Sequence, residues 1–242
     1  MRMTLHIALR EHNANRRAGF AHGLAAAYLA LSGTLWVYAL HTGDGGALPP
    51  GALWAGTHAR LLPVFAIFAT LRTFAVERAQ GTLDALLVSP APAGSIVLGK
   101  FFAAFSLPLG TLALSMLGPL TILPCVASCP GAETSALALF AGFVLLVLQA
   151  ALWTALGIFL SVLLRSQALV AAAALLLAGA LPLGLRFFDA ALASPLARPH
   201  IAAFDAVYGV FSLYHFACFA APVPALLFMA ARALDFHHYR TR

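Results

Sequence analysis

Residues 72–92 read RTFAVERAQGTLDALLVSPAP, and the chain then continues to Gly99 and Lys100. This charged segment, interrupted by Gly and Pro, lies between two long apolar runs. The whole chain is 62% hydrophobic and only 9% charged. Charged groups are costly in hydrocarbon, so a segment of this kind must lie outside a bilayer. It is therefore the place where the chain can contact a soluble partner.

The composition around this segment indicates an integral membrane protein. Soluble domains carry about 25% charged residues, far more than this chain of 242 residues has. Its apolar runs are continuous rather than alternating, which excludes an outer-membrane β-barrel. The net charge of +6 is best explained by basic residues that set topology. Nucleic acid is therefore not an expected partner.

The hydrophobic pattern predicts an all-α fold with six membrane spans in one domain, residues 1–242. Each run is long enough to cross about 30 Å of hydrocarbon at 1.5 Å per residue. Residues 1–17 mix apolar and basic side chains. They are either an amphipathic helix at the inner membrane surface or a solvated basic tail. The predicted spans are 19–41, 53–75, 94–123, 135–164, 167–187 and 207–231.

The distribution of Lys and Arg predicts that both termini are cytoplasmic. With the N-terminus inside, 11 of the 14 basic residues fall in cytoplasmic segments and 3 fall outside. Cytoplasmic loops of membrane proteins carry such an excess. The chain is therefore expected in the inner (cytoplasmic) membrane, in contact with its lipids. The three outer basic residues are Arg60, Arg186 and Arg198.

The cytoplasmic segment itself predicts a short helix between spans 2 and 3. Gly81 favours a turn, and Thr82 can cap a helix of about two turns that the following prolines end. Three leucines then share one face at helical spacing. That face either docks in a groove on a partner or packs on the protein's own bundle or the lipid headgroups. The leucines are Leu83, Leu86 and Leu87.

The pattern Glu77-Arg78-x-x-Gly81-Thr82-Leu83-x-x-Leu86-Leu87-x-x-Pro90, followed by Ile96 to Lys100, closely resembles the signature of ABC-2 type transporter permeases. Thr70-Leu71-Arg72 and the six-span layout resemble the gliding-motility and copper-processing branch. One departure is Asp84, where many relatives carry Glu. The resemblance implies that this segment is the coupling helix that docks on an ATP-binding subunit.

The resemblance also implies a function, an exporter permease rather than an enzyme. The docking residues would be Glu77, Arg78, Gly81, Thr82, Leu83, Leu86 and Leu87, with Arg72 and Lys100 anchoring the flanks at the inner headgroups. ATP and Mg²⁺ would be bound by the partner subunit, and this chain would bind no cofactor. A second permease chain, identical or related, would complete the pathway. The alternatives are a haem-exporter-type permease of cytochrome c maturation, a membrane-embedded lipid-modifying enzyme and a non-transporting anchor for an ATPase.

Absent motifs support a partner ATPase. The chain has no G-x-x-x-x-G-K-[ST] phosphate loop and no hydrolase motif. Cys125 and Cys129 flank an outer loop, where a disulfide is plausible in an oxidising compartment. Arg60, within the second span, either snorkels outward, faces the bundle interior or contacts an anionic substrate headgroup. Gln149 is expected to form an interhelical hydrogen bond.

Overall fold

All regular structure in the described part of the chain is helical. The computed structural model describes residues 2–17, 19–42, 49–71, 73–74, 77, 80–81, 92–127, 136–164, 166–185, 205–207 and 213–240. The helices are α1 (Arg2–Arg17), α2 (Gly19–Thr42), α3 (Pro50–Thr70), α6 (Ala93–Ser115), α7 (Leu117–Ala127), α8 (Ala136–Leu163), α9 (Gln167–Leu185), α12 (Leu213–Ala220) and α13 (Pro222–Arg240). The prediction of an all-α fold is confirmed for these residues.

Five helical stretches are long and apolar enough to cross a membrane: Gly19–Thr42, Pro50–Thr70, Ala93–Ile122, Ala136–Leu163 and Leu213–Phe236. The third joins α6 to α7 and the fifth joins α12 to α13. The stretch of α9 that was assessed, Gln167–Gly179, is shorter than a span. Five of the six predicted spans therefore match helices of spanning length, and the span at 167–187 stays a prediction.

Two predicted spans had wrong boundaries, and proline explains one of these errors. The second span was predicted over 53–75, but α3 begins at Pro50 and ends at Thr70. Proline is favourable in the first turn of a helix, where its missing N–H has no partner to lose. The last span was predicted over 207–231, whereas α12 ends at Ala220 and α13 continues from Pro222 to Arg240.

Helices α3 and α8 form the centre of the bundle. Their apolar stretches are 67% and 61% buried, against 11% for α2, which therefore lies at the periphery. One large core cluster packs α3 and α8 against side chains from α2, α6 and α12, among them Trp36, Leu112 and Phe219. A second cluster joins α8 to α6 and α13.

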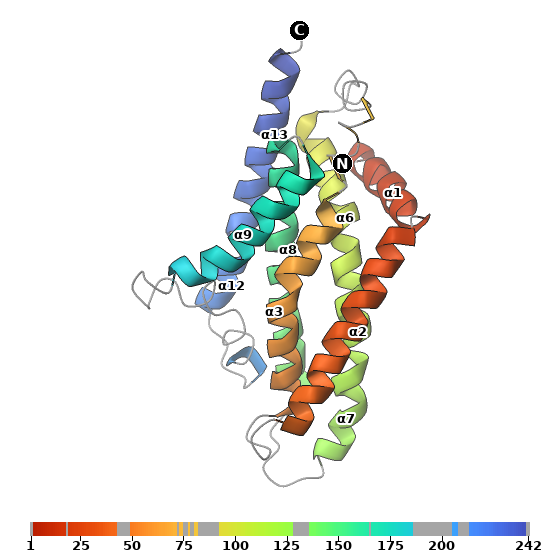
Figure 1. The fold of residues 1–242 in the computed structure, drawn as a ribbon, viewed down its shortest axis with the longest axis vertical. Helices are drawn as coiled ribbons and strands as arrows, with labels where there is room; N and C mark the ends of the chain where they lie inside the picture. Colours follow the sequence, from red (N-terminus) through yellow and green to blue (C-terminus); the bar gives the residue numbers. More distant parts are fainter. Residues whose placement is uncertain are drawn as a thin grey trace.

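Figure 1 shows the helices running up and down along one long axis. Both α1 and the last turns of α13 lie at the same end of the bundle, which we call the α1 end. Helices α8 and α13 run toward this end together, and both contribute to one core cluster, α8 with Ala155 and Val162 and α13 with Leu227 and Leu234.

A side chain on α8 repairs a defect in α3. Pro63 lies inside α3 and has no N–H for the carbonyl oxygen four residues earlier, that of Ala59. The Gln149 side-chain amide donates to this oxygen at 2.8 Å, and Gln149 is 2% exposed. The expected interhelical hydrogen bond of Gln149 is therefore confirmed. In hydrocarbon, such a carbonyl must find its partner inside the protein.

Candidate functional site

The first described residues after α3 are fixed on α8 at the α1 end. Phe74 is fully buried, and its backbone N–H donates to the Ser161 hydroxyl at 3.2 Å. Thr70, the last residue of α3, faces Gly157 so closely that a Cβ at 157 would collide with the Thr70 hydroxyl. The chain thus leaves α3 against α8 before it reaches Glu77.

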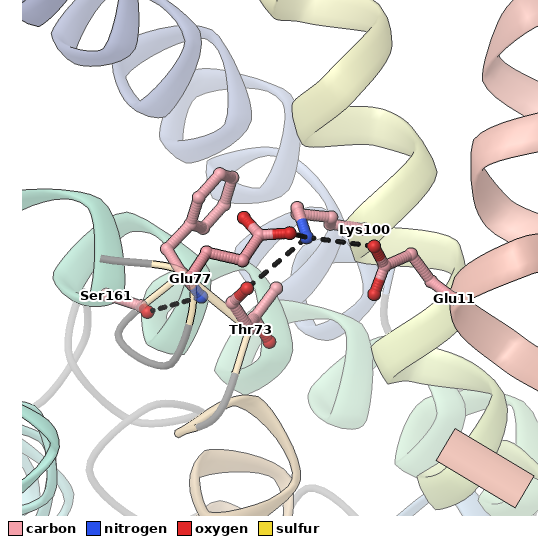
Figure 2. Close-up of polar contacts among 6 residues, drawn as sticks. Glu11, Thr73, Glu77, Lys100 and Ser161 are labelled. Carbon is pink, nitrogen blue, oxygen red and sulfur yellow. Dashed lines mark hydrogen bonds and ion pairs between the residues drawn. The ribbon is translucent and has the colours of Figure 1, made fainter. Parts of the chain in front are cut away.

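Lys100 is the single lysine of the sequence, and the fold buries it. Its side chain, on the second turn of α6, is 1% exposed. The Nζ donates to Glu77 Oε1 at 2.7 Å, to Glu11 Oε1 at 3.1 Å and to the Thr73 carbonyl at 3.3 Å. An ammonium group has three donors, so these acceptors use all of them. Figure 2 shows this Lys100 cluster, which consists of Glu11, Thr73, Glu77 and Lys100.

A glycine lets α1 approach α6 beside this cluster. A Cβ at Gly99 would lie 2.7 Å from Ile7 Cγ2 and 3.2 Å from the Thr4 carbonyl oxygen. Only a residue without a Cβ fits this approach unless Ile7 shifts. A further hydrogen bond of 2.8 Å joins His12 Nδ1 to the Ser106 hydroxyl. Gly99 therefore allows α1 to pack closely on α6, and the adjacent Lys100 binds Glu11 of α1.

The cluster brings two acidic side chains to one basic side chain. Two carboxylates face one ammonium group, so the three side chains together carry one formal negative charge. The Glu11 and Glu77 side chains are 30% and 21% exposed, which leaves water access to the acids but not to Nζ. The Phe74 ring adds a cation–π contact, with Nζ 5.2 Å from its centroid. The cluster joins α1, α6 and the segment after α3.

This placement differs from two expectations. Lys100 was expected to anchor the segment at the inner headgroups, yet its ammonium group is buried and bound to carboxylates. Glu77 was expected on a docking surface, but its carboxylate points toward Lys100 (Figure 2). Gly81 is exposed and has a φ of 68°, the left-handed conformation that glycine adopts readily. The predicted turn at Gly81 is therefore confirmed.

Other predicted site residues lie outside the described residues. These are Arg72, Arg78, Thr82, Leu83, Leu86 and Leu87, so the coupling helix stays a prediction. Cys125 belongs to α7 and Cys129 lies outside the described residues, so the disulfide also stays a prediction. No group of His, Cys, Asp or Glu suited to a metal ion occurs among the residues that were searched, which are the described ones.

Sequence reasoning did not single out Glu11, Phe74 or Ser161. Glu11 carried one available signal, because it is the only acidic residue in the basic segment before α2. Its partner lies 89 positions away, and helical periodicity describes neighbours within one helix only. Phe74 and Ser161 resemble ordinary apolar-segment residues, and no pattern distinguishes them.

A comparison with protein families decides the class. The family model described as "ABC-2 family transporter protein" matches residues 8–219. The chain belongs to this ABC-2 family. No curated protein matches it. The ABC-2 match extends from α1 into α12 and includes all three charged residues of the Lys100 cluster, Glu11, Glu77 and Lys100. This ABC-2 protein is thus a multi-pass membrane permease subunit.

Proposed function

We propose that this permease is the membrane subunit of an ATP-driven exporter whose ATP is hydrolysed by a separate subunit. The observation that carries the proposal is the Lys100 cluster, which binds both flanks of segment 82–91 to each other. Glu77 precedes this segment and Lys100 follows it, and their side chains meet at 2.7 Å. Because its two flanks are joined, a force that a partner applies to this segment would move the helices of the bundle with it.

The docking surface in this proposal is the leucine face of the predicted coupling helix. Leu83, Leu86 and Leu87 would lie in a groove of the ATP-binding subunit, with Arg78 and Thr82 beside them. The turn at Gly81 supports this role, because it separates the bound Glu77 from the residues that would project outward. ATP and Mg²⁺ would be held by the partner, since the chain has no phosphate loop.

The arrangement of the helices supports six spans and a cytoplasmic α1 end. Helices α8 and α13 run in the same direction (Figure 1), so the chain between them must return across the bundle. Helix α9 is the apolar helix in that interval, and it would be the remaining span. An even number of spans places both termini on one side, and the bias of Lys and Arg makes that side cytoplasmic.

Coupling would then be a rigid-body movement. A push on the docking helix would reach α6 through Glu77 and Lys100, and α1 through Glu11. It would reach α8 through the Phe74–Ser161 hydrogen bond. Such movement switches a pathway between facing sides. A second permease chain would complete that pathway. This holds whether the permease belongs to the gliding-motility and copper-processing branch or to the haem-exporter branch.

Co-expression with a candidate ATP-binding subunit tests the proposal. We expect Leu83→Asp to abolish co-purification, because it places a charge in an apolar groove, and Leu86→Ala to weaken it about tenfold. Gln167→Asp is the matched control, since it adds a carboxylate at an exposed position of the α1 end. Undiminished co-purification and ATPase coupling in Leu83→Asp would overturn the assigned docking face.

A further inference from the structure

Arg60 has an unusual position on a central helix. It is the eleventh of the 21 residues of α3, so ten residues separate it from either end, about 15 Å at 1.5 Å per residue. Its neighbours His58 and Ala59 are buried, and His58 Nδ1 is hydrogen-bonded to the Tyr28 hydroxyl at 2.7 Å. Arg60 is instead exposed. Of the three alternatives for Arg60, the one in which it faces the bundle interior is therefore wrong.

The guanidinium has no ion-pair partner among the described residues. The salt bridges found there belong to Lys100. A charged side chain this far along a spanning helix is costly, and residues of this kind generally serve a pathway or a ligand. The core does not need Arg60, because the buried side of α3 is satisfied by Tyr28 and Gln149. No described residue therefore supplies a counter-charge to the Arg60 guanidinium.

The surface around Arg60 is apolar. Thr57, Val64 and Phe68 continue its stripe along α3 at helical spacing, and each is at least partly exposed. Helix α9 covers α3 only nearer the α1 end, where Val170 and Ala174 pack on Ile67. Farther along, α9 leads away from α3 (Figure 1), and its Leu175 and Leu176 are exposed. A single cation thus lies on a face suited to acyl chains.

We propose that Arg60 binds the phosphate headgroup of an anionic amphiphile that approaches α3 from the lipid. This inference rests on the proposed function, for which it names the substrate class. The planar guanidinium binds phosphate oxygens in pairs, and the surrounding side chains would contact the tails. Headgroup binding at this depth would draw the amphiphile out of the headgroup layer, as an exporter of lipid-like molecules requires.

A second copy of the chain fits this position less well. The sequence has eight acidic residues, and none falls within the described helices α2, α3, α6, α7, α8, α9 and α12. Glu11 belongs to α1 and Asp235 to the last turns of α13, both at the α1 end. Glu77 and Asp205 fall between the long apolar helices, and the remaining four lie outside the described residues: Asp44, Asp84, Glu133 and Asp189. A partner chain would therefore bring no carboxylate from its apolar helices to the depth of Arg60.

Native mass spectrometry of the full-length permease in a neutral detergent tests the site. The probes are phosphatidylglycerol, phosphatidylcholine and inorganic phosphate. We expect phosphatidylglycerol to bind preferentially, Arg60→Gln to weaken it about tenfold and Arg60→Lys to weaken it less. Arg232→Gln is the control, because Arg232 is also exposed on a spanning stretch but lies near the α1 end. Inorganic phosphate should not compete.

Three results would overturn the proposal. Equal losses in Arg60→Gln and Arg232→Gln would indicate bulk lipid around the bundle. Displacement of the lipid by inorganic phosphate would indicate a site for a free anion. Dissociation of a permease dimer in Arg60→Gln, with lipid affinity unchanged, would make Arg60 a subunit contact.

A second measurement separates this proposal from the proposed function. Lipid binding is measured on the permease alone, so failure to co-purify an ATPase would reject the transporter assembly and leave the Arg60 site standing. In an assembled complex, we expect phosphatidylglycerol to stimulate ATP hydrolysis, and Arg60→Gln to reduce that stimulation about tenfold. A wild-type complex that binds the lipid but shows no stimulation would reject the substrate class alone.

Discussion

Replacing Lys100 by Met should loosen the α1 end of the permease more than any other single charge removal there. The methionine keeps most of the side-chain volume but takes the ammonium group away from Glu11, Glu77 and the Thr73 carbonyl. Two carboxylates then face each other without their cation. We therefore expect Glu77 and position 100, which form the stem of segment 82–91, to separate, and α1 to detach from α6.

The magnitude follows from the distances and the burial. At 2.7 and 3.1 Å, and with an effective dielectric constant of about 20, each ion pair gains about 5–6 kcal/mol before desolvation is subtracted. Desolvation removes much of this gain, but losing one partner of a buried pair still costs about 3–5 kcal/mol. The partial exposure of both acids favours the lower figure, about 3 kcal/mol. For a chain of this length that corresponds to a fall in Tm of about 6–12 °C.

The assay exploits the fact that Lys100 is the single lysine. In the native wild-type protein an amine-reactive reagent should modify Lys100 slowly, because the side chain is 1% exposed. The Tm in detergent should fall in Lys100→Met, and the charge exchange Lys100→Glu with Glu77→Lys should recover part of the loss. Rapid modification of native Lys100, or a Tm change below about 2 °C in Lys100→Met, would refute the buried cluster.

Three further perturbations test neighbouring features. Gly99→Val should push α1 off α6, because even a Cβ there meets Ile7 at 2.7 Å, and amine labelling of Lys100 should accelerate without loss of membrane insertion. Gln149→Leu should cost about 1–3 kcal/mol by leaving a buried carbonyl unpaired, and much less in a Pro63→Ala background, where the backbone regains its N–H; equal costs in both backgrounds would contradict the repair. A reporter fused after Ser89 should read cytoplasmic, and an external signal there would remove the docking proposal.

Much of this fold was predictable because the spans are continuous apolar runs, a signal that depends on composition alone. The boundaries depended on proline, which both starts and interrupts helices. Pro50 precedes the predicted span 53–75, yet it opens α3. Arg232 and Asp235 ended the apolar run at the C-terminus, but α13 continues past both, because charges that are exposed (Arg232) or partly exposed (Asp235) are compatible with a helix that leaves the hydrocarbon.

The candidate site was only half predictable, for a different physical reason. The sequence singled out Glu77 as a docking residue and Lys100 as an anchor of the flank at the headgroups. It did not show that they bind each other across 23 positions, or that Glu11 joins them. Pairing between helices depends on how the helices pack, and that packing is set by small residues such as Gly99. One signal for such a site was available in the sequence, because Lys100 is the single lysine among 14 Lys and Arg residues. Arg cannot replace it there, since a guanidinium cannot place three tetrahedral donors in so compact a site.

The Lys100 cluster also constrains how a docked partner could drive this permease. A push on segment 82–91 could be absorbed by opening its stem, or it could move the stem and the bundle together. Opening the stem would separate Glu77 from Lys100 and leave a buried ammonium group short of an acceptor, which costs about 3 kcal/mol or more. Turning α6 together with α1 breaks none of these bonds. The cheaper route is therefore movement as one body, so an ATPase complex should protect Lys100 from amine reagents as well as the free permease does. Faster labelling during ATP turnover would mean that the stem opens instead.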